Sequence, residues 1–360
     1  MSKIRPIAIY LPQFHPIPEN DEWWGKGFTE WTNVTKAKPL FKGHHQPNLP
    51  GELGFYDLRV PEVREQQAVL AREHGIEGFM YWHYWFAGKR LLERPFQEVL
   101  ESGKPDFPFC LGWANESWKG TWHGLSEGEM LIEQTYPYIK DYEDHFYTVL
   151  PAFKDKRYIT VDGKCFFLIY RPFEIPNANL FIDLWSELAK KNGLSGIYFV
   201  AYSYNAEKEY NKLINMGFDG IQSYWVPYAV NVLKQESFIR RLKSKLRDFG
   251  ISSFEIYEYG DLIKYLVRPV DSEVNIFPTI IPRWDNSPRS GKSSRIIINS
   301  SPDLFRKHVC DILKIIQGKP EKYRILFIKS WNEWAEGNYI EPDMEFGRMY
   351  LEVFKKEIDN

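Results

Sequence analysis

Cysteine is scarce in this chain. Cys110, Cys165 and Cys310 are the three cysteines among 360 residues. They are odd in number and far apart, which argues against a disulfide framework and against a zinc site. A chain of this length can bury a large hydrophobic core without such crosslinks.

The chain also lacks an excess of charge of either sign. Lys and Arg number 46 and Asp and Glu number 48, so no basic footprint for nucleic acid or anionic lipid is present. No apolar run is long enough to cross a membrane, and Met1–Pro6 leads straight into the strand-like Ile7–Leu11 without a signal peptide. We therefore expect a cytoplasmic protein with no membrane span. The sequence leaves the oligomeric state open.

No low-complexity stretch and no Ser/Gly linker divides the chain, so we expect one domain over residues 1–360. Short apolar runs alternate with amphipathic segments, as in parallel α/β folds. Eight runs read as strands: Pro6–Leu11, Ile76–Trp82, Phe107–Trp113, Cys165–Tyr170, Gly196–Tyr202, Phe218–Tyr224, Asn275–Ile281 and Arg324–Ser330. The helix-like segments are Pro61–His74, Ala178–Asn192, Glu207–Met216, Phe238–Phe249, Pro302–Ile316 and Met344–Ile358.

Eight such repeats predict an α/β protein of the closed (β/α)8 TIM-barrel type. An open, doubly wound sheet is the alternative, but no Gly-x-Gly-x-x-Gly follows the first strand. Long loops follow the first and third strands, Pro12–Pro61 without an obvious helix and Trp113–Tyr138. Loops of that length in a compact domain are usually functional. By composition, Arg283–Ile298 is expected to be the most mobile segment.

Aromatic residues make up 17% of the chain, and many stand beside Asn, Glu, His or Gln where a predicted strand ends. In a (β/α)8 barrel these ends surround the active site. Flat rings with a polar edge suit sugars, whose faces are apolar and whose rims carry hydroxyls. The candidate substrate-binding residues are Tyr10, Gln13, His15, Trp31, His83, Tyr84, Trp113, Asn115, Glu116, Tyr170, Tyr202, Tyr224, Trp284, Asp285, Trp331, Asn332 and Trp334.

Two carboxylates in the last of these clusters are the candidate catalytic residues. Glu333 and Glu336 would point apart on an extended strand, but a helical turn brings residues three apart to within about 5–6 Å. Two carboxyls in one pocket can then differ in pKa, with the more buried one as acid and the other as base. Such a pair cleaves or forms glycosidic bonds. The structural alternative is that one Glu caps the turn or pairs with an arginine.

The remaining polar candidates carry less weight. Glu116 reads as substrate-binding or supporting rather than catalytic, and Asp285 as either a sugar-hydroxyl acceptor or a turn former. His15 and His83 are candidate hydroxyl ligands, and no third residue has the spacing of a metal triad. We expect no metal and no cofactor.

Six segments together carry a resemblance to a known family: Tyr10–Pro16, Trp23–Val34, Gly54–Arg59, Lys89–Glu93, Trp113–Glu116 and Trp331–Gly337. They resemble the WbsX-type proteins, which are related to glycoside hydrolase family 99, the endo-α-mannosidases. The resemblance covers nearly the whole chain and also implies a (β/α)8 barrel. It further implies a retaining mechanism in which Glu333 acts as base on the substrate 2-hydroxyl, giving a 1,2-anhydro sugar, while Glu336 protonates the leaving oxygen and then helps water to open the epoxide.

Three functions remain open. The first is a glycosidase or transglycosidase that acts on an α-linked oligo- or polysaccharide, with manno-configured glycans as candidates. The second is a glycosyltransferase in lipopolysaccharide, O-antigen or capsular polysaccharide synthesis, as WbsX-type proteins are often described. The absence of an Asp-x-Asp metal-nucleotide motif argues against it unless the donor is lipid-linked. The third is a silent glycan-binding barrel, which would not need both Glu333 and Glu336.

Overall fold

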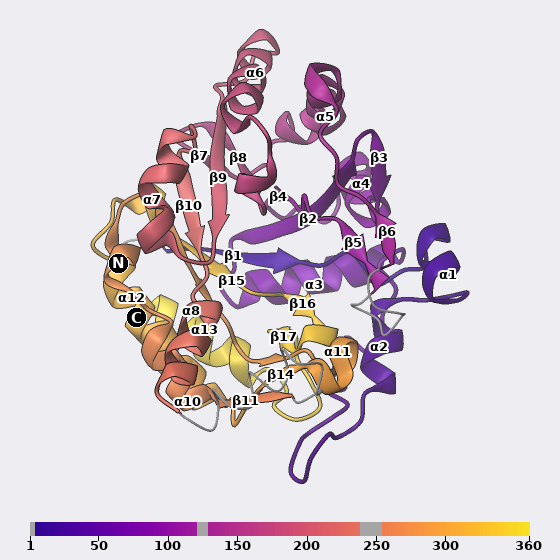
Figure 1. The fold of residues 1–360 in the computed structure, drawn as a ribbon, viewed down its shortest axis with the longest axis vertical. Coiled ribbons are helices and arrows are strands. Elements are labelled where there is room, and N and C mark those ends of the chain that lie inside the picture. Colours follow the sequence, from indigo (N-terminus) through magenta and orange to yellow (C-terminus); the bar gives the residue numbers. More distant parts are fainter. Residues whose placement is uncertain (1–3, 121–128, 238–253) are drawn as a thin grey trace.

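The computed structural model describes residues 4–120, 129–237 and 254–360. Eight parallel strands in this part of the chain form a closed barrel, because β1 pairs with both β2 and β15 (Figure 1). The predicted (β/α)8 fold and all eight predicted strands are therefore confirmed. In chain order the strands are β1 (Arg5–Tyr10), β2 (Gly78–Phe86), β4 (Phe109–Trp113), β8 (Lys164–Ile169), β9 (Ile197–Ser203), β10 (Gly220–Ser223), β12 (Ile276–Ile280) and β15 (Ile325–Ile328).

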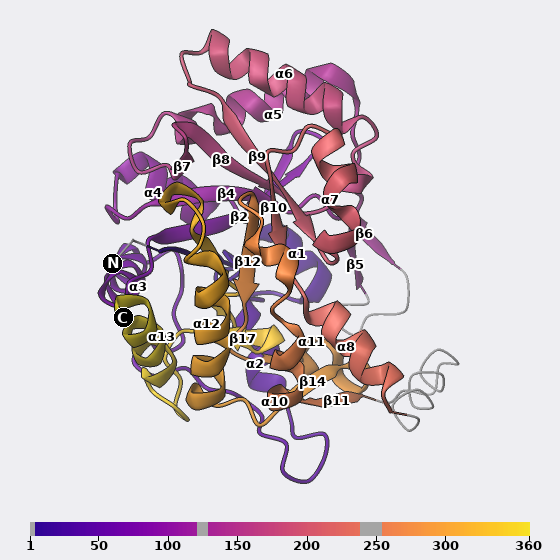
Figure 2. The ribbon, with the colours of Figure 1, turned by 90° about the vertical axis from the view of Figure 1, so that its left-hand side faces the viewer.

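Helices follow the barrel strands and cover the outside of the barrel (Figure 2). They are α3 (Pro61–Glu73), α4 (Arg94–Ser102), α5 (Tyr138–Phe153), α6 (Ala178–Lys191), α7 (Ala206–Asn215), α8 (Val226–Gln235), α12 (Pro302–Ile316) and α13 (Met349–Asp359). The predictions for α3, α6, α7 and α12 are accurate to within two residues, whereas α13 begins five residues after the predicted Met344. The helix predicted over Phe238–Phe249 lies outside the described residues.

The barrel strands alternate between the barrel interior and the surrounding helices, as the period of two in a strand requires. On β2, Trp82 and Tyr84 face the interior. Their neighbours point outward, where Tyr81 packs on Phe96 of α4 and His83 meets α5. Both faces of the strand are therefore buried, as expected for a parallel sheet that is covered by helices.

The long segment after β1 contains two short helices, so the prediction of a loop without helices was wrong. They are α1 (Pro18–Trp24) and α2 (Glu30–Lys36). Pro18 occupies the first turn of α1, where its missing N–H costs nothing. At the start of α2 the Thr29 N–H donates to Thr32 Oγ1 at 3.3 Å. Each helix has seven residues, which is too short to display a clear 3.6-residue apolar period.

The segment Arg283–Ile298, which we expected to be the most mobile, forms regular structure instead. It contains β13 (Trp284–Asp285), α11 (Ser287–Ser290), a 3₁₀ turn (Gly291–Ser293) and β14 (Arg295–Ile298). β14 pairs with β13 and with β11 (Glu255–Glu258) in a small separate sheet. Ile296 and Ile297 are buried there, so apolar packing orders a segment that is polar in composition.

The remaining elements are short. β3 (Lys89–Leu91) pairs with β2, and β7 (Thr160–Val161) pairs with β8, both in the antiparallel direction. β5 (Trp118–Lys119) pairs with β6 (Met130–Ile132), β16 (Asn332–Glu333) pairs with β17 (Asn338–Tyr339), and α10 (Tyr259–Leu262) follows β11. Among the described residues, no helix combines the length and the apolar character that a membrane crossing needs.

Candidate active site

A cavity of about 320 Å³ opens at the carboxyl ends of the barrel strands. Nine of the predicted site residues line it: Gln13, Tyr84, Glu116, Tyr170, Tyr202, Tyr224, Trp284, Glu333 and Glu336. They come from segments far apart in the sequence, and the closed barrel brings their strand ends together, as expected for this fold. Their part in binding or catalysis remains a prediction.

Three predicted residues point away from the cavity because they occupy outward positions on their strands. Tyr10 Oη donates to Gln67 of α3 at 2.6 Å. The Nε2 atoms of His83 and His145 lie 2.8 Å apart between β2 and α5, and Trp113 packs on α6. Burial lowers the pKa of His83 to about 3, so this histidine is neutral. The residues selected at the strand ends included neighbours in the sequence, and successive side chains of a strand point to opposite faces, so only some of them reach the cavity.

Four further predicted residues lie beneath the cavity wall and serve packing. Trp31 packs against Trp334 with ring centroids 5.4 Å apart. Trp331 is fully buried against Phe79 of β2. His15 is buried, and its Nδ1 lies 3.0 Å from the carbonyl oxygen of Pro12.

The last three predicted residues hold the cavity loops in place. The side-chain amide of Asn332 bonds both the N–H and the carbonyl of Leu11, at 2.8 and 3.0 Å, and so joins the end of β15 to that of β1. Asn115 accepts from the N–H of Arg171 at 2.8 Å. Asp285 accepts from Gln46 Nε2 at 2.5 Å and lies 2.8 Å from His44 Nε2. His44 is itself buried.

None of the basic residues that line the cavity in the described part of the chain was selected from the sequence. The lining residues that were not selected include Trp24, Trp82, Trp118, Lys119, Arg171, Tyr204, Arg289, Arg295 and Lys329. Trp82 could have been found from its alternation with Tyr84 on one strand. Arg289 offered no such signal, since it lies on α11 within the segment that composition marked as mobile.

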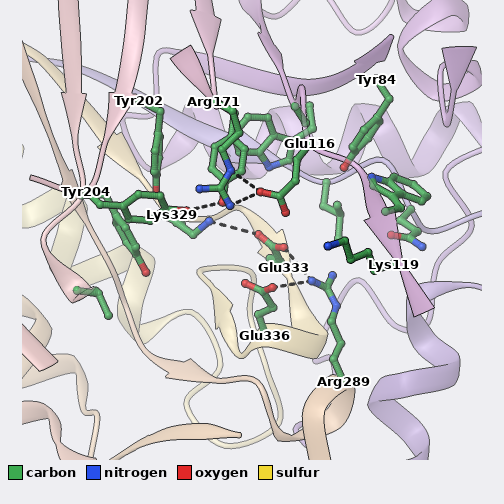
Figure 3. A pocket seen from close by; sticks show the side chains of 18 of the residues that line it. Tyr84, Glu116, Lys119, Arg171, Tyr202, Tyr204, Arg289, Lys329, Glu333 and Glu336 are labelled. Atoms are coloured by element: carbon green, nitrogen blue, oxygen red, sulfur yellow. Dashed lines mark hydrogen bonds and ion pairs between the residues drawn. The ribbon is translucent and has the colours of Figure 1, made fainter. Parts of the chain in front are cut away.

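Glu333 and Glu336 converge in the way that the sequence predicts for a helical turn. Glu333 ends β16, and a 3₁₀ turn over Trp334–Glu336 brings the second carboxylate back to the same side. Arg289 Nη1 lies 3.3 Å from Glu333 Oε1 and 2.7 Å from Glu336 Oε1 (Figure 3). Gly337 then leaves the turn with φ +64°, a left-handed conformation that glycine adopts without strain.

The two carboxylates have different surroundings. Glu333 accepts from Ser330 Oγ at 3.2 Å and lies 4.0 Å from Lys329 Nζ. Glu336 accepts from Asn338 Nδ2 at 3.3 Å. Burial, followed by the negative charge of Glu333, raises the pKa of Glu336, while Arg289 opposes the shift. The side chain of Glu336 is nevertheless the more exposed of the two, 20% against 8% for Glu333.

A third carboxylate lies behind this pair. Glu30 of α2 is fully buried and accepts from Arg289 Nε at 2.9 Å and from Nη2 at 2.7 Å. Burial raises the pKa of Glu30, and Arg289 is the main influence in the other direction. One guanidinium therefore contacts three carboxylates. Glu333 and Glu336 converge, as predicted, and each also pairs with an arginine, which was the alternative explanation for them.

An aromatic arc and a second ion pair complete the cavity. Tyr170, Tyr202, Tyr224 and Trp284 follow one another around the strand ends, with successive ring centroids 5.0, 5.8 and 6.3 Å apart. Glu116 pairs with Arg171, as Figure 3 shows. The cavity therefore combines ring faces with charged and hydroxyl groups, the composition expected for a sugar site. Within the described residues, no group of three His, Cys, Asp or Glu side chains is arranged to hold a metal ion.

The same barrel occurs in solved structures of low sequence identity. A GH99 endo-alpha-mannosidase from Bacteroides thetaiotaomicron aligns over 99% of this chain and 96% of its own, with a TM-score of 0.56 and 15% identity. A glycoside hydrolase-like protein aligns over 99% of this chain and 94% of its own, with a TM-score of 0.60 and 13% identity. At such identities the likeness establishes the fold.

Fold and site thus define a (β/α)8-barrel protein with a carboxylate pair at the carboxyl end of its eighth strand. The family model described as glycosyltransferase WbsX matches residues 6–354, and the chain therefore belongs to the WbsX family. The uncharacterized protein WxcX from two strains of Xanthomonas campestris pv. campestris is 36% identical over 353 residues. That alignment covers 98% of this chain and 49% of WxcX, so the chain spans about half the length of these curated relatives.

Proposed function

We propose that this protein is a retaining glycosidase or transglycosidase that acts on an α-linked oligo- or polysaccharide with the help of the substrate 2-hydroxyl. The proposal depends on one observation: Glu333 and Glu336 both contact Arg289 Nη1 within the cavity, but their other neighbours differ. Inverting enzymes leave room for a water molecule between separated carboxylates. A shared Arg289 contact leaves little such room and favours a retaining route.

The first proposed step forms a 1,2-anhydro sugar. Glu333 takes the proton of the substrate 2-hydroxyl, and O2 attacks the anomeric carbon as the bond from that carbon to the leaving oxygen breaks. Glu336 gives its proton to the leaving oxygen, which departs as an alcohol. The raised pKa of Glu336 supports this role, because the acid must hold its proton near neutral pH.

The second step opens the epoxide. Glu336, now ionised, takes a proton from water or from an acceptor hydroxyl, whose oxygen attacks the anomeric carbon. Glu333 returns its proton to O2 as the epoxide bond breaks, so both carboxyls regain their starting states. Water gives hydrolysis and a sugar hydroxyl gives transglycosylation. Because O2 supplies the nucleophile, neither carboxylate has to reach the anomeric carbon.

The proposal is tested with bacterial polysaccharide fragments, incubated with and without nucleotide sugars and analysed by mass spectrometry. Chain shortening without a donor is the expected result. Glu333→Gln and Glu336→Gln should each lower turnover by about 10²–10⁴-fold, the usual contribution of a positioned acid or base. Glu62→Gln, an exposed change on α3, is the matched control. If either site variant kept more than about a tenth of wild-type turnover, the roles assigned above would be wrong.

A second candidate is a glycosyltransferase in lipopolysaccharide, O-antigen or capsular polysaccharide synthesis. The family description favours it, and so do the cationic side chains that line the cavity in the described part of the chain, which could hold the phosphates of a sugar donor: Lys119, Arg171, Arg289, Arg295 and Lys329. In the same experiment, products that lengthen only when a nucleotide sugar or a lipid-linked sugar is added would establish this function and exclude the first.

A further inference from the structure

Lys329 occupies an unusual position in the cavity wall. Its side chain is 8% exposed at the end of β15, and the nearest carboxylate oxygen, Glu333 Oε2, lies 4.0 Å from Nζ. That separation exceeds a hydrogen bond, which for an ammonium and a carboxylate is about 2.7–2.9 Å. Within the described residues, no side chain or carbonyl accepts a hydrogen bond from this ammonium, although it carries three N–H donors.

Two aromatic rings flank the ammonium. Nζ lies 5.5 Å from the centroid of the Tyr224 ring and 5.8 Å from that of Trp284. Cation–π contacts of this length stabilise the charge and hold the side chain against the two rings. They leave the N–H donors free for a ligand.

Three buried polar atoms on aromatic residues of the same cavity are also without partners among the described residues. They are Tyr202 Oη, Tyr224 Oη and Trp284 Nε1, all buried and all on residues that line the cavity. The two tyrosines are 2% and 4% exposed, and burial raises the pKa of both, so their hydroxyls stay protonated. An indole N–H and an ammonium can only donate, and each phenol has a proton to donate. A buried donor without an acceptor costs free energy, so this set calls for a ligand that is rich in acceptors.

We propose that Lys329, Tyr202, Tyr224 and Trp284 form a subsite for an anionic substituent of the glycan, the carboxylate of a hexuronic acid residue. The inference rests on the proposed function for its sugar substrate and adds the class of sugar. A carboxylate offers acceptor positions on two oxygens and no donor, which matches a set in which each of the four groups can donate. A neutral hydroxyl brings a proton of its own, for which this set supplies acceptors only on the two phenols.

The competing explanation is that Lys329 serves Glu333 alone. The other cavity cations show what such pairing looks like: Arg289 approaches Glu336 to 2.7 Å, and Arg171 lies against Glu116. Lys329 stops at 4.0 Å and turns toward the aromatic rings instead. A long-range effect on Glu333 is compatible with this position, but it does not explain the three unpartnered donors around it.

Direct binding tests the subsite without any turnover. The probes are the methyl α-glycosides of mannuronic and glucuronic acid, compared with methyl α-mannoside and methyl α-glucoside, with affinities measured by ligand-observed NMR. We expect the uronides to bind at least about tenfold more tightly, since charge-assisted hydrogen bonds are the strong ones. Lys329→Met should abolish this preference while neutral glycosides still bind. Equal affinity for both kinds of glycoside, or an undiminished preference in Lys329→Met, would overturn the inference.

Two further measurements separate the outcomes. Trp284→Phe keeps a ring and removes one donor, so a partial loss of uronide preference is expected even if Lys329→Met folds poorly. Inorganic phosphate is the competing probe: if it displaces the uronides and binds more tightly, the subsite serves a phosphate group and the carboxylate assignment is wrong. Failure of the glycosidase proposal would appear instead as unaltered turnover in Glu336→Gln, a result that leaves the affinity comparison intact.

Discussion

Replacing Arg289 by methionine should expose how strongly this site depends on one cation. The guanidinium contacts Glu30, Glu333 and Glu336, whose side chains are 0%, 8% and 20% exposed. Methionine keeps the apolar stem and leaves three carboxylates without their shared partner. Removing one member of a buried ion pair typically costs about 3–5 kcal/mol, because the remaining charge is left uncompensated. We therefore expect Arg289→Met to lower the free energy of unfolding by about that amount at pH 7.

The pH dependence of the loss follows from linkage. In the folded protein the pKa values of Glu30 and Glu336 already lie above the ordinary carboxyl value, and losing Arg289 raises them further. The folded state then binds more protons than the unfolded chain, so stability decreases as pH rises from the ordinary carboxyl pKa through the raised folded value. The destabilisation of Arg289→Met should accordingly be small near pH 4 and grow toward neutrality.

Thermal unfolding of wild type and variant between pH 4 and 8 measures both effects. At about 2 °C per kcal/mol for a chain of this size, the melting temperature should fall by roughly 6–10 °C at pH 7. Adding Glu30→Gln to Arg289→Met removes one uncompensated charge and should recover part of the loss. Lys292→Met, an exposed change just after α11, is the control and should have almost no effect. A loss below about 1 kcal/mol in Arg289→Met, or one that does not change with pH, would refute the reasoning.

Three further predictions concern the same end of the barrel. In Glu333→Gln the pKa of Glu336, followed by carboxyl ¹³C NMR, should fall, since the Glu333 charge helps to raise it; an unchanged or higher value contradicts the coupling. Gly337→Ala places a Cβ 2.7 Å from the Asp285 nitrogen at φ +64° and should destabilise the fold by more than about 2 kcal/mol. Gly27→Ala, at φ +80° with open space, should cost only about 1 kcal/mol, and similar melting temperatures for the two would argue against the steric effect. Burial raises the pKa of Glu341 to about 7, so wild-type stability should decline between pH 5 and 8, and Glu341→Gln should flatten that decline in urea unfolding.

The barrel could be read from the sequence because its signals are local. Each strand is a short apolar run with both faces buried, and α3 begins at Pro61 and ends before Gly75. These features follow from hydrogen bonding and burial within a few residues. The short helices α1 and α2 were not predicted, because seven residues are too few to show a clear 3.6-residue apolar period.

Part of the site could also be predicted from the sequence, for a different reason. The convergence of Glu333 and Glu336 depends on a single turn, so their spacing was enough to predict it. Which aromatic side chains reach the cavity depends on strand register, and Tyr84 faces inward while its neighbour His83 faces α5. Successive side chains of a strand point to opposite faces. The types of residue in a cluster therefore do not show which of them face the cavity.

The sequence by itself determined the class of fold, the place of the acidic pair and the polar, aromatic composition of the strand ends. Only the tertiary structure decided how that pair is controlled. Arg289 comes from a segment that looked mobile, Glu30 from a loop that appeared to have no helix, and Lys329 from the residue that follows β15. Their charges act across space, and the distances between them depend on how the closed barrel and its loop helices α2 and α11 are packed.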